Sequence, residues 1–122
     1  MEWMEMSPGL WVTDSAPQEA EGITELLTSI ERLVASVPGP VAILFDATGP
    51  VRSFSTEVVQ GYLQVIKRHR ADLMRIYVAS SSPTVRFAGS AARLVLGNSL
   101  HMFASVSEAI AHHEAQTRAR SA

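Results

Sequence analysis

The residues of this chain most suited to chemistry stand at the two ends of a short loop. An apolar run, Val41–Phe45, ends at Asp46, and the loop after it leads to Ser53-Phe54-Ser55-Thr56-Glu57, directly ahead of a strongly periodic helix. A phosphate is well tolerated at a helix N-terminus, because the free N–H groups and the helix dipole favour an anion there. Ser55 and Thr56 are therefore candidate phosphoacceptors. The alternative is that one of them only caps the helix, which stabilises it by about 1 kcal/mol.

A second group of hydroxyls, Ser80-Ser81-Ser82, follows the apolar segment Arg75–Ala79. The working surface of an open α/β sheet usually lies where its parallel strands end, so we expect both groups at one edge of the sheet. The hypothesis is that this edge binds a protein partner. The predicted partner-binding residues are Asp46, Ser53, Phe54, Ser55, Thr56, Ser81 and Ser82.

Two arginines, Arg86 and Arg93, lie seven residues apart in the helix that follows, and so on one helix face. With Ser81, Ser82 and Thr84 they form a candidate site for a phosphate or a lipid head group. The alternative is a solvated face whose arginine stems cover apolar area.

Other kinds of chemistry lack their sequence motifs. The histidines His69, His101, His112 and His113 have no ligand-spaced partners, and the adjacent pair points about 100° apart on a helix. There is no Gly-x-Ser-x-Gly motif, no glycine-rich phosphate or dinucleotide loop, and no cysteine for thiol chemistry. We therefore expect a protein that is not an enzyme and that uses no metal and no cofactor.

The candidate residues are positioned by a regular alternation of strands and helices. Apolar patterns and turn residues predict strands at Glu2–Met6, Leu10–Thr13, Val41–Ala47, Arg75–Ala79 and Leu100–Phe103. The first two helices are predicted to start at Ser15-Ala16-Pro17-Gln18 and near Ser55 or Thr56. The third is predicted to be capped by Ser80-Ser81-Ser82-Pro83, and the fourth to start at the capping box Ser105–Glu108. The fourth helix is predicted to fray from Thr117. The small residues Ala88, Gly89 and Ala92 should let the third helix lie close to the sheet. This order predicts an α/β fold: an N-terminal hairpin, then a small mixed sheet with a parallel core, Val41–Ala47 in its middle, packed by four helices.

Length and composition bound the class of protein. With 122 residues and 47% hydrophobic residues, we expect one globular domain, 1–122. No apolar run approaches the roughly 20 residues of a membrane span, and the acidic N-terminus is unlike a signal peptide, so we expect a cytoplasmic protein. Cations interleaved with aromatic residues are missing, which argues against nucleic acid. Residues 1–66 carry nine acids and two bases, and residues 67–122 carry eight bases and three acids, a split that can orient partners or drive head-to-tail self-association. Apolar residues of the last helix and of the hairpin are compatible with a homodimer.

The order of elements on this length resembles the STAS domain family, the sulfate-transporter and anti-sigma-factor-antagonist module. It looks most like the stand-alone bacterial members of the SpoIIAA type and their SEC14-like relatives. Members place a buried strand ending in Asp, then a loop, then an Asp-Ser-Ser/Thr-Gly-like motif at a helix N-terminus. Here these are Phe45-Asp46 and Phe54-Ser55-Thr56-Glu57, with Phe54 in place of the acid and Glu57 in place of the glycine. Phe103–Ala109 also looks like the last strand and helix start of the family. The resemblance implies that Thr56 or Ser55 is phosphorylated to switch partner binding.

Together these observations predict a regulatory or scaffolding module that binds another protein. A small-ligand domain, for a nucleotide or a lipid, at the same edge is the first alternative, and a hydrolase is the second. A pocket deep enough to bury a ligand would favour the first alternative. A flat apolar patch beside the Ser53–Thr56 loop would favour the protein interface.

Overall fold

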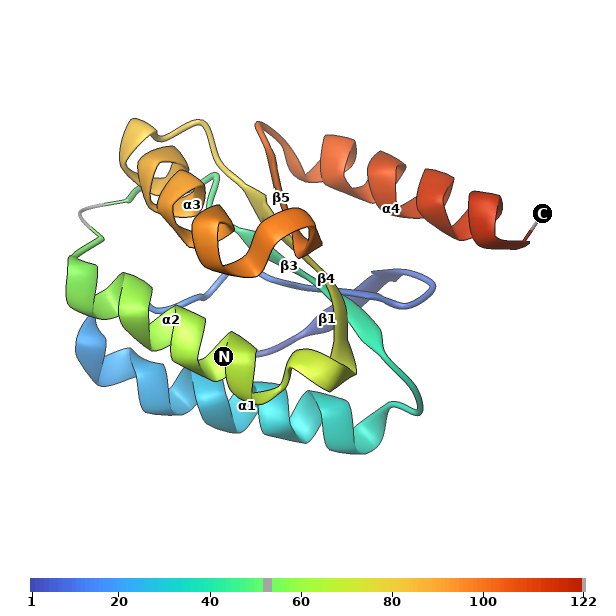
Figure 1. Cartoon of the computed structure of the whole chain (residues 1–122), viewed down its shortest axis with the longest axis horizontal. Helices are drawn as coiled ribbons and strands as arrows, with labels where there is room; N and C mark the ends of the chain where they lie inside the picture. The colour runs from blue at the N-terminus through green and yellow to red at the C-terminus, as the bar shows by residue number, and fades with distance from the viewer. Residues whose placement is uncertain (52–53, 122) are drawn as a thin grey trace.

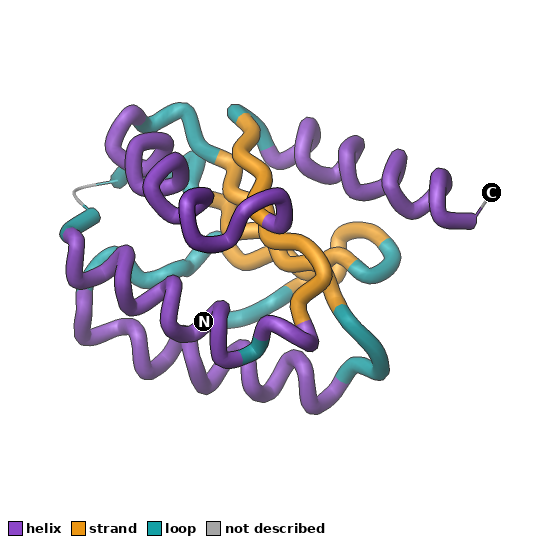
Figure 2. The backbone as a smooth tube through the Cα atoms, viewed as in Figure 1, coloured by secondary structure: helices purple, strands orange, loops and turns teal. Residues whose placement is uncertain are grey.

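The computed structural model describes residues 1–51 and 54–121, which form a five-stranded sheet with helices on both faces (Figures 1 and 2). The strands are β1 (Met4–Ser7), β2 (Leu10–Thr13), β3 (Val41–Asp46), β4 (Leu73–Ala79) and β5 (Leu100–Phe103). The α-helices are α1 (Ile23–Ser36), α2 (Thr56–Arg68), α3 (Pro83–Leu96) and α4 (Val106–Ser121). Ser53, a predicted partner-binding residue, lies outside the described residues.

The strands follow one another across the sheet in the order β1-β2-β3-β4-β5. β1 pairs antiparallel with β2 through the predicted hairpin, where Gly9 takes a φ of 79° that suits glycine. The other three pairs are parallel. β3 is the middle strand and its residues Val41–Phe45 are buried, so the predicted α/β fold with a parallel core is confirmed.

The two faces of the sheet are covered unequally. Helices α1, α2 and α3 cover one face, which we call the three-helix face, and α4 alone covers the other, the α4 face (Figure 1). Alternation along β3 sends Ile43 and Phe45 to the three-helix face and Ala42 and Leu44 to the α4 face. The sheet therefore has two separate apolar cores.

The start of α1 differs from the prediction. The predicted helix begins at Ser15–Gln18, but the structure has irregular chain there, a 3-10 turn at Ala20–Gly22, and α1 only from Ile23. Tertiary contacts hold this segment away from helical geometry: the Tyr62 hydroxyl donates to the Pro17 carbonyl at 2.5 Å, and the Gln18 side chain donates to the Pro50 carbonyl at 3.1 Å. The segment therefore packs against α2 and the loop after β3 and does not form the first turn of α1.

Helix α3 lies close to the sheet, as its small residues predict. A Cβ on Gly89 would stand 2.3 Å from the Met102 sulfur of β5, so the glycine lets α3 approach β5 with the Met102 side chain in this position. The large apolar residues Phe87 and Leu94 point outward from α3 and are 79% and 90% exposed. They form no part of the core.

Helix α4 begins at the predicted capping box. Ser105 Oγ accepts from the Glu108 N–H, and the Glu108 carboxylate accepts from the Ala104 N–H. The predicted fraying from Thr117 is wrong, because the helix continues to Ser121. Among the described residues, no helix combines the length and the apolar character that a bilayer crossing demands.

Candidate functional site

The predicted working edge forms where β2, β3 and β4 end. Asp14 follows β2, Asp46 closes β3, and Ser80 follows β4. Thr13 pairs with Phe45 and Asp46 pairs with Ala79, so these ends stand at one level of the sheet. The edge is therefore assembled as the sequence predicts.

Asp46 organises the loop that leaves this edge. Its Oδ1 accepts hydrogen bonds from the Thr48 N–H at 3.0 Å and the Thr48 hydroxyl at 2.5 Å. The Ala47 N–H donates to the Ala79 carbonyl at 2.8 Å, which ties the loop to β4. A local turn of this kind is a common role for an Asp after a strand.

The two candidate phosphoacceptors have different surroundings. Ser55 is the N-cap of α2, and its Oγ accepts from the Val58 N–H at 3.2 Å. Thr56 is the first residue of the helix, and its side chain is exposed. Ser55 therefore caps the helix, and phosphorylation of Ser55 or Thr56 stays a prediction. Phe54 packs against Tyr62, with ring centroids 5.8 Å apart.

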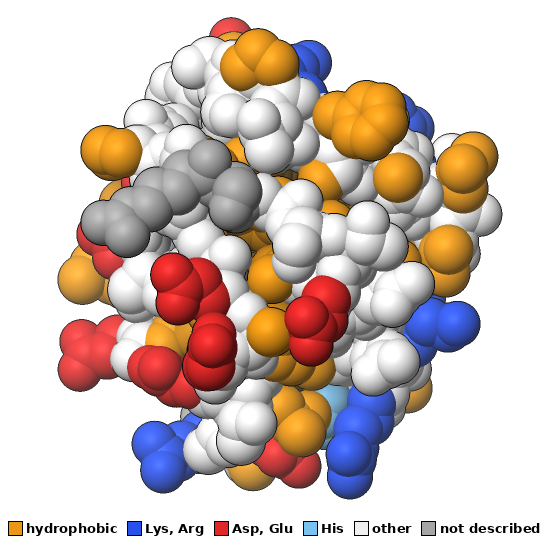
Figure 3. All heavy atoms as spheres, turned by 90° about the vertical axis from the view of Figure 1, so that its left-hand side faces the viewer, with side chains coloured by type: hydrophobic (Ala, Val, Ile, Leu, Met, Phe, Trp, Pro, Cys, Tyr) orange, Lys and Arg blue, Asp and Glu red, His pale blue; other side chains and the backbone are white. Residues whose placement is uncertain are grey.

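An apolar cavity of about 220 Å³ opens beside this loop, between α2 and α3 on the three-helix face. Most of its lining is aliphatic or aromatic. The helices contribute Val59, Tyr62, Leu63, Ile66, Val85, Ala88, Gly89, Ala92 and Leu96. The sheet contributes Phe45, Ile76, Val78 and Leu100, and the loops contribute Ala16, Ala47, Pro50, Val51 and Phe54. Figure 3 shows hydrophobic side chains gathered across this side of the molecule.

Few polar groups border the cavity. Tyr62 is one, but its hydroxyl already donates to Pro17, and burial raises its pKa well above the usual range, so it stays neutral. The others are Asp14, Gln18 and Asp46. Periodicity could not reveal the cavity, since its lining residues read as ordinary core positions. The small residues Ala88 and Ala92 of α3, which line the cavity, are the one local signal of it in the sequence.

The serines after β4 lie at the edge but do not line the cavity. Ser80 is buried, and its Oγ accepts from the Ser82 N–H at 3.1 Å. Ser82 precedes α3 as its N-cap, without a side-chain hydrogen bond to the helix, and Ser81 is exposed. Their role in binding a partner stays a prediction.

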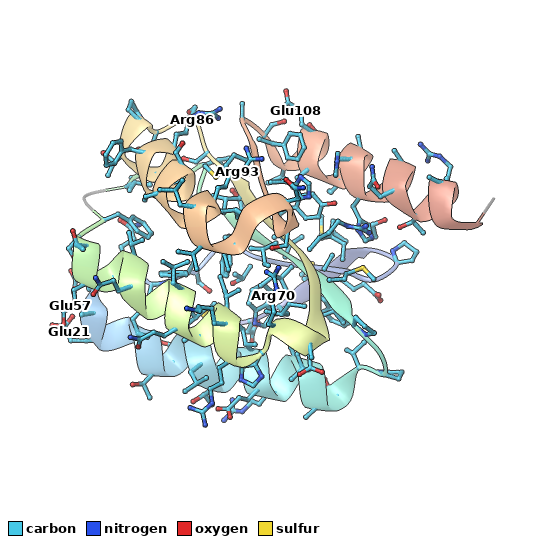
Figure 4. All side chains as sticks on the ribbon, in the orientation of Figure 1. Glu21, Glu57, Arg70, Arg86, Arg93 and Glu108 are labelled. Carbon is cyan, nitrogen blue, oxygen red and sulfur yellow. The ribbon has the colours of Figure 1, made fainter. Side chains whose placement is uncertain are left out.

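The predicted anion site has its arginines on the side of α3 turned away from α2 (Figure 4). Arg86 donates to the Ser80 carbonyl at 3.3 Å, and Thr84 is exposed. Arg93 is close enough to His101 of β5 to help lower its pKa. Neither arginine lines the cavity. An anion site here stays a prediction separate from the cavity.

The α4 face holds a group of polar side chains that sequence reasoning missed, here called the histidine cluster: Arg75, Tyr77, His101, His112 and His113. The Tyr77 hydroxyl bonds His112 Nδ1 at 2.9 Å. His113 donates from Nε2 to the Pro8 carbonyl at 2.8 Å, which leaves Nδ1 to accept from Arg75 at 3.3 Å.

Electrostatics in this cluster oppose added positive charge. Burial, then His112 and the guanidinium groups of Arg75 and Arg93, lower the pKa of His101. Burial, then Arg75 and His113, lower the pKa of His112. Burial raises the pKa of Tyr77. Among the described residues, no group of three or more His, Cys, Asp or Glu side chains is placed to hold a metal ion.

Comparison with known proteins bears on the fold. No protein-family model and no curated protein matches the sequence. A crystal structure of an uncharacterized protein from the DUF3478 family with a SpoIIAA-like fold, from Shewanella loihica PV-4, matches with a TM-score of 0.53 and 18% identity. The match covers 83% of this chain and 78% of that chain. The chain therefore has the SpoIIAA-like fold that its resemblance to the STAS family predicted.

Proposed function

We propose that this chain is a non-enzymatic binding module of the STAS type whose main site is the apolar cavity between α2 and α3. The observation that carries the proposal is the cavity itself, about 220 Å³ and lined almost wholly by apolar side chains. A concave apolar site with few polar groups is typical of small-ligand binding. This feature favours the small-ligand alternative over a flat protein interface.

The size of the cavity sets the size of the ligand. An engineered protein cavity of about 150 Å³ lined by Leu, Ile and Phe binds benzene, so a somewhat larger cavity accepts one ring or a short alkyl chain. A nucleotide fits poorly, because its phosphates would meet no Lys or Arg among the described lining residues.

Binding is tested by titrating the ¹⁵N-labelled protein with indole and with toluene and following amide chemical shifts. We expect shifts concentrated at residues of α2, α3 and the Ala47–Val51 loop. Ala92→Leu places a larger side chain in the cavity and should abolish the shifts. Ala91→Leu changes an exposed neighbour and should leave them intact. Absence of shifts in the unmodified protein, or shifts equally strong in Ala92→Leu, would contradict the proposal.

A second function, regulated binding of a protein partner, is favoured by the exposure of Thr56. Because the Ser55 hydroxyl is engaged in capping, Thr56 is the better phosphoacceptor of the two. A phosphate there would add about −1.5 to −2 charges beside the cavity-lining loop. A partner docked over the loop would then meet a charge that it must desolvate.

The partner hypothesis is tested by affinity purification from the source cell, with mass spectrometry of partners and of phosphosites. Thr56→Glu should lose partners that Thr56→Ala retains, and a phosphosite should map to Thr56. If Thr56→Glu retains every partner, the switch is wrong, and the cavity proposal is unaffected.

A further inference from the structure

Among the residues that the structure describes, the charged side chains that border the cavity are acidic. The ionisable carboxyl groups among its described lining residues are Asp14 and Asp46, and no described Lys, Arg or His lines it. Glu21 and Glu57 lie at the same end of the molecule (Figure 4), and Figure 3 shows carboxylates clustered on this side, with basic side chains toward the periphery. The described side chains therefore contribute a negative potential at the mouth of the cavity.

Aromatic rings form part of the cavity wall. Phe45 and Tyr62 pack edge to face, with ring centroids 5.5 Å apart, and Phe54 joins Tyr62 at 5.8 Å. All three line the cavity. Ring faces carry negative partial charge and attract organic cations, most strongly where water is excluded.

Among the described polar groups at the mouth, the carboxylates of Asp14 and Asp46 are acceptors, and the Gln18 amide donates to the Pro50 carbonyl. Asp46 Oδ1 is occupied by Thr48, but Oδ2 has no hydrogen-bond partner in the described part of the chain. The Tyr62 hydroxyl is occupied by Pro17. A ligand head that donates hydrogen bonds suits this mouth, whereas a carboxylate or phosphate head would be repelled.

We propose that the cavity binds an organic ammonium ion: a single ring or short alkyl chain occupies the apolar interior, and the charged nitrogen lies at the mouth, near Asp14 and Asp46. This inference rests on the proposed function, since it specifies the ligand of the same cavity. The aromatic wall and the acidic groups at the mouth both favour a cation. The cavity thereby selects against fatty acids, phospholipids and nucleotides of similar apolar size.

The test uses three ligands with a common phenyl body: 2-phenylethylammonium, 2-phenylethanol and 3-phenylpropanoate. Their affinities for the full chain are measured by calorimetry and amide shifts at pH 7 and low salt. We expect the ammonium ion to bind about tenfold or more tighter than the alcohol, and the carboxylate to bind most weakly, because a field at the mouth acts on charge alone. The preference should shrink as salt rises, whereas the affinity of the alcohol should not.

Variants separate the two proposals. Asp14→Asn/Asp46→Asn keeps an acceptor for Thr48 and should bring the ammonium ion to the affinity of the alcohol, while Glu31→Gln, an exposed change on α1, should alter nothing. If the alcohol or the carboxylate binds as tightly as the ammonium ion to the unmodified chain, the ammonium proposal is wrong and the cavity remains a ligand site. If none of the three ligands and no indole binds, the proposed function itself is wrong.

Discussion

The two faces of the sheet differ in how many helices cover them and in how completely side chains fill the space beneath those helices. The three-helix face is shielded by three helices yet keeps an apolar cavity, which the small residues Ala88 and Ala92 of α3 help to line. The α4 face is shielded by one helix and is filled by large polar side chains of the histidine cluster. Coverage by helices and completeness of packing are therefore separate properties in this fold.

The difference predicts that the two faces respond to different changes in conditions. Space between α2 and α3 can be taken by a ligand without breaking a hydrogen bond. On the α4 face, His113 and His112 join α4 to β4 and to the β1–β2 turn, so the attachment of α4 depends on titratable groups. The three-helix face should then respond to ligands, and the α4 face to pH.

The largest expected effect comes from truncating the tyrosine at the centre of the α4 face. Tyr77 is fully buried and contacts the rings of His101, Phe103, His112 and His113. Tyr77→Ala should lower the free energy of unfolding by about 3–5 kcal/mol in urea titrations, as for other large aromatic truncations. Tyr62→Ala, at the border of the cavity, should cost less, about 2 kcal/mol, because its ring is only partly packed. Equal losses in the free energy of unfolding for the two variants would contradict the proposed difference in packing between the faces.

The next effect compares one substitution on the two faces. Ala109 of α4 is fully buried, so Ala109→Leu overfills the core and should destabilise the protein by about 1–3 kcal/mol. Ala92→Leu on α3 extends into the cavity and should raise the free energy of unfolding by about 0.5–1 kcal/mol, as cavity-filling changes often do. Both changes are Ala to Leu in a helix, so helix propensity is matched. Destabilisation of similar size at both sites would show that the cavity is closed in solution.

A smaller effect follows from the lowered pKa values of His101 and His112. The folded protein holds both residues neutral, whereas the unfolded chain protonates them as the pH falls through about 6.5. The unfolded state then binds more protons, so stability is full above that pH and declines below it, until the folded pKa values are reached. Urea titrations from pH 7.5 to 5 should show this decline. The double variant His101→Gln/His112→Gln should show a flatter profile, and an unchanged profile would exclude these two groups as its cause.

The sequence predicts those parts of the molecule that local patterns determine. The apolar run Val41–Phe45 suffices to place the middle strand, and the hydroxyl residues Ser55 and Thr56 place the start of α2 to within one residue. The failed helix start at Ser15–Gln18 depends on hydrogen bonds from Tyr62 and to Pro50, which are distant in sequence and leave no local signal. For the same reason neither the cavity nor the histidine cluster could be predicted. Both arise from side chains that only the tertiary fold brings together.

The smallest expected change in stability, and the sharpest test of the α4 face, concerns Arg75. Its Nε is buried without a hydrogen-bond partner, and its guanidinium contacts the ring of His113 and the hydroxyl of Tyr77. Arg75 is half-buried and has no carboxylate partner among the described residues. Replacing such a charge with an apolar side chain is often neutral or stabilising, so Arg75→Met should stay within about 1 kcal/mol of the unmodified protein at pH 7.5. Because Arg75 lowers the pKa values of both His101 and His112, the same variant should flatten the pH profile. Arg93→Met, which affects only His101 of the two, should flatten it less. If Arg75→Met steepens the profile, positive charge does not control the attachment of α4, and its polar contacts act only as packing.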